Sequence, residues 1–195
     1  IVTFALLPPL ADSAQPTALP MLQIETGMHT GLIRKLAVDR ERNRILTVAD
    51  DKTLRVWRLP GIELIATHRV PADPGNEGQL FAVAIAPDGN TVATGGWTGW
   101  DWESRGTVYL LDTVSGALLR RLSGFPNVIG SLAYSRDGRY LAVGLQGKGG
   151  LFILALPEFK VVARDATYGD KVVEMDFDRT GKLAVSSLDG FVRVY

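Results

Sequence analysis

Short apolar runs, many of them alternating with polar residues, recur along the whole chain and are separated by turn residues. Alternation with a period of two places successive side chains on opposite faces of a β-strand. Segments 87–90 and 136–139 each contain an Asp-Gly pair, which supplies the positive φ that a tight hairpin needs. No segment keeps a helical period over its length. The pattern therefore predicts an all-β chain.

The same succession of runs occurs four times. Each copy has an inner apolar run, a turn, a second run, and a third run that ends on a large residue, namely Trp57, Leu111, Leu154 or Tyr195. Two of the three intervals between these ends are close to the period of about 40–45 residues of a four-stranded propeller blade. Fourth strands are expected at 64–67, 118–122 and 161–164.

With these repeats, residues 21–195 resemble the WD-repeat (WD40) family of β-propellers. The segments that carry the resemblance are His29-Thr30-Gly31, the Asp-Gly turns and the run Asp51–Trp57. The four copies correspond to about four antiparallel blades. The resemblance implies that each blade has strands a to d running outward from a central channel, and that a complete ring has more blades, commonly seven. It also implies that the d–a loops between blades and the b–c loops within them share one face. It maps the family's structural tetrad onto His29, Thr47, Asp51 and Trp57.

The other blades depart from this tetrad. Asp51 corresponds to Arg105, Lys148 and Asp189, and Thr47 corresponds to Thr94, Val143 and Val185. We therefore expect those three blades to be fixed mainly by apolar packing.

Blade boundaries follow from the repeat: we expect blades at about 27–68, 69–122, 123–164 and 165–195, with 21–26 as an outer closing strand. Residues 1–20 form an apolar, Pro-rich leader, which we interpret as a truncated signal peptide. This start, without Met, favours a fragment of a larger bacterial-type protein. Such a protein is exported to the periplasm or outside the cell if the leader is a signal remnant, and is cytoplasmic otherwise.

The Gly-rich segment 95–106 contains three of the four tryptophans, in a b–c loop that is longer than its counterparts. The d–a connection of the same blade, 70–78, is extended as well. Tryptophan offers a large contact area and a polar N–H, so this loop is a candidate docking surface. The alternative is that the indoles turn inward and cover the blade or the channel. The candidate partner-binding residues are Trp97, Trp100, Asp101, Trp102 and Arg105.

Residues suited to catalysis are scarce. The absence of cysteine excludes thiolate nucleophiles, disulfides and Cys-ligated metals. Of the two histidines, His29 is assigned to the tetrad, and His68 is expected to be solvated at the end of a strand. No local Ser-His-Asp set, zinc-type His pair or phosphate-binding loop is present. We therefore expect no catalytic residue, no metal and no cofactor.

The chain has no net charge that would attract it to nucleic acid or anionic membranes, because 21 basic residues balance 21 acidic ones. No apolar stretch is long enough to span a bilayer. The cluster Arg40, Arg42 and Arg44 is expected to lie on a solvated hairpin.

These features favour a non-enzymatic interaction scaffold that binds a protein or peptide through its loops, with a carbohydrate as the alternative ligand. One competing hypothesis is a propeller enzyme of the lactonase or hydrolase type, with Asp176 at the channel. Another is a recruiting region for a downstream catalytic domain.

Overall fold

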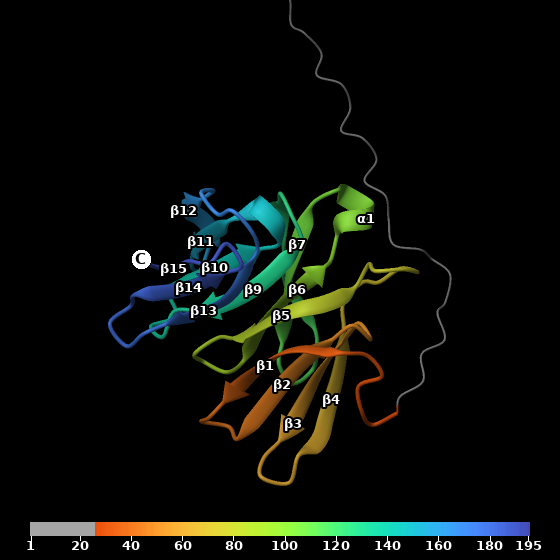
Figure 1. The fold of residues 1–195 in the computed structure, drawn as a ribbon. Helices are drawn as coiled ribbons and strands as arrows, with labels where there is room; N and C mark the ends of the chain where they lie inside the picture. The colour runs from red at the N-terminus through yellow and green to blue at the C-terminus, as the bar shows by residue number, and fades with distance from the viewer. Residues whose placement is uncertain (1–25) are drawn as a thin grey trace, which may run out of the picture.

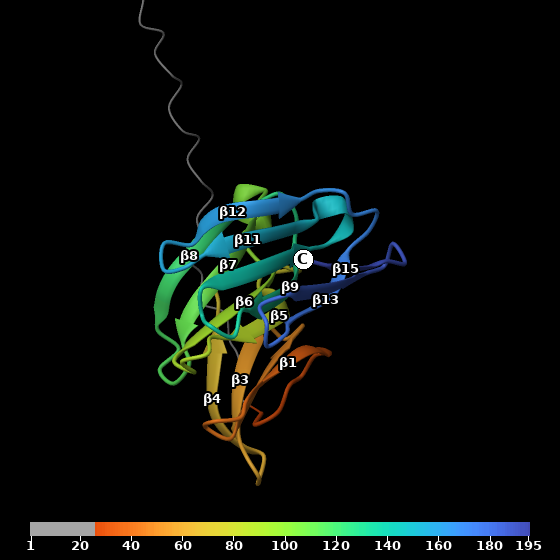
Figure 2. The same cartoon turned by 90° about the vertical axis from the view of Figure 1, so that its left-hand side faces the viewer.

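The structure, a computed structural model, describes residues 26–195. The predictions for the leader 1–20 and for nearly all of the closing strand 21–26 concern residues outside this range. Fifteen strands form four antiparallel sheets, three of them four-stranded and the last three-stranded (Figures 1 and 2).

Each sheet is built from strands that are consecutive in the sequence. The first contains β1 to β4, at Ile33–Asp39, Arg44–Ala49, Thr53–Arg58 and Glu63–Arg69. The second contains β5 to β8, at Gln79–Ile85, Thr91–Trp97, Gly106–Asp112 and Leu118–Phe125. The third contains β9 to β12, at Ile129–Tyr134, Tyr140–Leu145, Leu151–Ala155 and Lys160–Asp165. The fourth contains β13 to β15, at Val172–Phe177, Leu183–Ser187 and Val192–Val194.

Two short helical turns interrupt the strands: the α-helix α1, Trp100–Glu103, between β6 and β7, and a 3-10 turn, Gly147–Gly149, between β10 and β11. The sequence pattern predicts neither of them, because one turn is too short to show a helical period.

The sheets are arranged as the blades of a propeller. Their first strands are the inner ones, and β1 contacts β5, β5 contacts β9, and β9 contacts β13. Within each sheet the strands follow in sequence order from the inside outward, each hydrogen-bonded to the next. This confirms the predicted all-β fold of antiparallel blades.

The central strands of a blade are buried on both faces. In β7, Val108 and Leu110 belong to the core shared with the third blade, whereas Tyr109 and Leu111 belong to the core shared with the first. Because side chains alternate across a strand, one continuous apolar run supplies two separate interfaces. A third core joins the third and fourth blades.

The outward faces of the two end blades carry exposed apolar side chains. On the first blade these include Leu36 and Val38, which are 58% and 45% exposed; on the fourth, Val192 and Val194 are 73% and 65% exposed. Among residues 26–195, no sheet packs on these two faces.

The Asp-Gly turns have the expected geometry. Gly89 and Gly138 have φ of 66° and 71°, in the region where a side chain is strained. Each closes its turn by donating its N–H to the carbonyl three residues earlier, on Ala86 and Ser135 respectively.

The four residues of the mapped tetrad form one hydrogen-bonded chain. The Trp57 indole N–H donates to the Thr47 hydroxyl at 2.7 Å, and that hydroxyl lies 2.7 Å from Nε2 of His29. Nδ1 of His29 lies 2.9 Å from the Asp51 carboxylate. Asp51 also accepts the Thr30 N–H at 2.9 Å, so the chain fixes the loop that precedes β1.

The fourth blade has a related polar contact in addition to its apolar core. Asp189 accepts the Gly169 N–H at 3.0 Å, as Asp51 accepts that of Thr30. Its carboxylate pairs with Arg193 at 2.8 Å, and that guanidinium lies over the Tyr168 ring, 4.2 Å from the ring centre.

Burial of Asp51 alone would raise its pKa, but hydrogen bonds from Thr53, Thr30 and His29 outweigh burial and lower it. An aspartate whose pKa is lowered by folding stabilises the fold above its unfolded pKa, which is about 3.9. That contribution is lost as the pH falls through the lower, folded value.

Replacing Thr47 with Val should lower the free energy of unfolding by about 1–3 kcal/mol, because it leaves the partly buried Trp57 N–H and His29 Nε2 without their partner. Urea unfolding measures the change. Thr91→Val is the matched control, since no hydrogen bond of the Thr91 hydroxyl is found within residues 26–195. Equal effects of the two substitutions would contradict a stabilising tetrad.

The Asp51→Asn variant should be less stable than the wild type at neutral pH, and this difference should shrink as the pH falls below about 4. Unfolding curves of both proteins between neutral and acidic pH provide the test. A difference that stays constant across this range would show that ionised Asp51 does not carry the contribution.

Candidate partner-binding face

The two extended loops of the second blade lie against each other, as the fold family implies. The fully buried Glu77, in the d–a loop, accepts N–H groups of the b–c loop from Gly99 and, at 2.9 Å, from Asp101. The Trp102 indole N–H, in the b–c loop, donates to the Asp73 carboxylate of the d–a loop at 3.2 Å. The loops therefore support each other at the end of the blade that bears α1 (Figure 1).

Glu77 explains why a helical turn forms in this loop. The first N–H groups of any helix lack partners within it, and the Glu77 carboxylate accepts two of those at the start of α1. Gly99, with φ of 76°, permits the sharp entry into the turn. Burial raises the pKa of Glu77, although the same N–H groups oppose that shift.

Trp97 and Trp100 form the accessible part of this segment. Both are half-buried, and their rings pack edge to face with centres 6.2 Å apart. The Trp97 indole N–H donates to the Asp101 carboxylate at 3.1 Å, which orients the ring. Asp101 is exposed, and so is Arg105, which follows α1 in the same loop.

Trp102 does not share this surface. It is only 9% exposed, because its indole turns inward and bonds to Asp73. The sequence allowed two arrangements, with the indoles either exposed for docking or turned inward. The Trp102 indole is turned inward, whereas those of Trp97 and Trp100 remain partly accessible. Trp102 is a supporting residue and not a candidate anchor.

Trp97 also lines a cavity of about 540 Å³ at the same end of the blades, here called the top cavity. Its volume lies within the usual range of ligand-binding pockets. Residues from all four blades line it, and they are Arg34, Lys35, Asn76, Gln79, Phe81, Trp97, Asn127, Val128, Gly130, Gln146, Lys171, Val172 and Val173.

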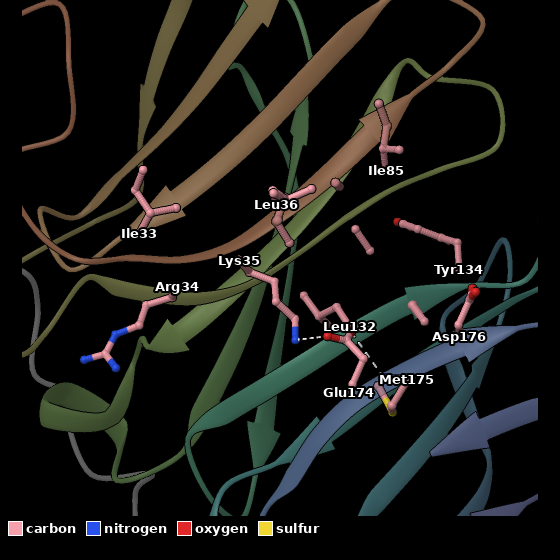
Figure 3. Close-up of a pocket in the computed structure, with 14 residues that line it drawn as sticks. Ile33, Arg34, Lys35, Leu36, Ile85, Leu132, Tyr134, Glu174, Met175 and Asp176 are labelled. Carbon is pink, nitrogen blue, oxygen red and sulfur yellow. Dashed lines mark hydrogen bonds and ion pairs between the residues drawn. The ribbon is translucent and has the colours of Figure 1, made fainter. Parts of the chain in front are cut away.

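A second cavity, of about 730 Å³, lies deeper between the inner strands (Figure 3). Across it the ammonium group of Lys35, on β1, pairs with the Glu174 carboxylate on β13 and bonds to the Val173 carbonyl at 3.1 Å. This contact links the first blade to the fourth.

Asp176, the residue of the enzyme hypothesis, lines this deeper cavity near Tyr134. The other carboxylate in its wall, Glu174, is held in the ion pair with Lys35. Within residues 26–195, no group of three or more His, Asp or Glu side chains is placed to hold a metal ion. No helix of that same range is long and apolar enough to cross a membrane.

His68 is not solvated as expected. It is 7% exposed, and its Nε2 lies 2.9 Å from the Thr113 carbonyl of the next blade. The turn that covers it needs Gly116, since a Cβ there would lie 2.3 Å from the imidazole. Arg44 is also buried, although it was expected to be solvated. Its guanidinium pairs with Asp39 at 2.7 Å and donates to the Gly89 carbonyl of the second blade.

The sequence predicts neither the role of Glu77 nor the polar lining of the top cavity. Glu77 lies more than twenty residues before the N–H groups that it accepts, so no local motif reveals it. The cavity residues come from separate blades, and only the closed arrangement brings them together.

Glu77→Ala should accelerate hydrogen exchange of the Gly99 and Asp101 amides, because their acceptor is lost. Glu77→Gln should have a smaller effect, since it keeps a carbonyl acceptor. Exchange followed by mass spectrometry measures both, with the exposed Glu63→Ala as control. Unchanged exchange in Glu77→Ala would show that this carboxylate does not fix the loop.

A comparison with protein families agrees with this geometry. Residues 23–58, which include β1, β2 and β3 and all four tetrad residues, match the family described as "WD domain, G-beta repeat". The structure repeats the same antiparallel blade through the second, third and fourth sheets. The chain is a β-propeller of WD40-like blades, and its first blade carries the WD40 repeat itself.

Proposed function

We propose that this chain is a scaffold that binds a protein or peptide partner on the face formed by the second blade's loops and the top cavity. Trp97 carries the proposal, because it lies at the end of β6 where the loop begins, lines the cavity and remains partly exposed. Trp100, Asp101 and Arg105 extend the surface beside it.

The family supports the general part of this proposal, since WD40 propellers are typically protein-interaction scaffolds. Tryptophan and arginine are also enriched among residues that dominate binding energy at interfaces. The proposed surface includes the contacting pair Trp97 and Trp100 and the exposed Arg105.

Rigidity of the loops is a second support. Binding is weakened when loops must become ordered, so a surface fixed beforehand binds more tightly. Glu77 fixes the loop of the second blade, while Asp51 and Asp189 fix the d–a loops of the first and fourth. The face is therefore prepared before a partner arrives.

The double variant Trp97→Ala/Trp100→Ala should lose affinity for bound peptides on the order of 30-fold, as expected when hot-spot side chains are removed. A phage-displayed library of random dodecapeptides is panned on the wild type, and synthetic copies of the enriched peptides are measured by calorimetry. Circular dichroism and urea unfolding establish that the variant is folded.

The matched control is Arg58→Ala/Ile62→Ala, in and beside the β3–β4 turn and remote from α1 (Figure 1). It should bind the peptides as the wild type does. Equal affinity of the tryptophan variant, or failure of the panning to enrich any peptide, would contradict the proposal.

Trp102→Ala should act differently. Loss of its buried indole should lower the free energy of unfolding by about 3–5 kcal/mol. If this variant instead keeps its stability and loses only peptide binding, Trp102 contacts the partner directly and is a binding residue.

A further inference from the structure

The top cavity has a one-sided charge although the chain as a whole is neutral. Three cationic residues, Arg34, Lys35 and Lys171, contribute to its wall, and no described Asp or Glu does so. Asn76, Gln79, Asn127 and Gln146 also line it and add hydrogen-bonding capacity, and the aromatic residues Phe81 and Trp97 line it as well.

Two of the three cations already have partners. Arg34 donates to both oxygens of Asp50, at 2.7 and 2.8 Å, and its guanidinium lies 5.2 Å from the centre of the Phe81 ring. The ammonium group of Lys35 is paired with Glu174. Their charges are therefore largely compensated by carboxylates outside the cavity wall.

Lys171 is the uncompensated cation. In the part of the chain that the structure describes, no hydrogen bond or ion pair reaches its ammonium group. Its backbone is nevertheless fixed, since its carbonyl accepts the Ser187 hydroxyl at 3.0 Å and the Leu188 N–H at 3.1 Å. Lys171 is half-buried, its ammonium group has no partner among residues 26–195, and no carboxylate of that range lines the cavity. This arrangement favours an anionic ligand.

We infer that the top cavity binds an acidic side chain of the partner, an Asp or Glu next to an apolar residue in an extended segment. Lys171 pairs with the carboxylate, the four amides hydrogen-bond the peptide backbone, and Trp97 and Phe81 pack against the apolar neighbour. The inference rests on the proposed function and specifies its partner.

The charge balance favours a peptide over nucleic acid. Binding to a nucleic acid backbone depends on neutralising several phosphates at once. One uncompensated cation matches one carboxylate, and the amides match a peptide backbone that alternates N–H donors and carbonyl acceptors.

The test uses the peptides enriched by panning on the wild type. They should contain Asp or Glu beside an apolar residue, and changing that residue to Asn or Gln should weaken binding to the wild type about tenfold. Lys171→Met keeps the aliphatic stem and removes the charge. This variant should bind the acidic peptide about tenfold more weakly and should not distinguish it from its amide form.

Lys160→Met, at an exposed position on β12, is the matched control and should bind like the wild type. Enriched peptides without an acidic residue, or equal discrimination by Lys171→Met and the wild type, would overturn the inference. So would an oligo-dT strand that displaces the peptide from the wild type but not from Lys171→Met.

These outcomes separate the two proposals. Peptides that depend on Trp97 and Trp100 but not on Lys171 leave the proposed function in place and remove the inference. Peptides that depend on neither remove both.

Discussion

Packing of successive blades against each other is the constraint on which the rest of this structure depends. A single four-stranded sheet cannot bury both of its faces, so each central blade is stable only between two neighbours. In β7 this requirement appears as alternate side chains that enter different cores, Val108 and Leu110 on one side, Tyr109 and Leu111 on the other. Within residues 26–195, the first and fourth blades each pack on one such neighbour and keep exposed apolar faces.

Blade packing places the d–a and b–c loops next to each other, and buried carboxylates then fix them. Asp51 and Asp189 project from b–c loops and accept N–H groups of d–a loops. In the second blade the roles of the two loops are reversed, because Glu77 lies in the d–a loop and accepts N–H groups of the b–c loop. The reversal in the second blade accompanies the only α-helical turn of residues 26–195, and it holds the segment that presents Trp97 and Trp100.

The sequence predicted those features that depend on local chemistry repeated along the chain. Alternating runs gave the strands, and the Asp-Gly pairs gave turns with positive φ at Gly89 and Gly138. Residues whose environment is made by a different blade were not predictable. His68 and Arg44 are buried because the second blade covers them, and Trp102 is buried because Asp73 accepts its N–H.

The candidate site follows the same division. A cluster of tryptophans in a long loop marked the second blade, but the sequence could not tell which indoles face outward. The cationic lining of the top cavity combines residues more than a hundred positions apart, such as Arg34 and Lys171. Its charge became apparent only once the ion pairs to Asp50 and Glu174 were known.

The most direct test of the account is a crystal structure of the chain with a peptide enriched by panning. The account predicts that the peptide lies in the top cavity, in contact with Trp97 and with its carboxylate beside the Lys171 ammonium group. A peptide seated on the exposed sheet faces of the first or fourth blade, with the top cavity filled only by water, would contradict it.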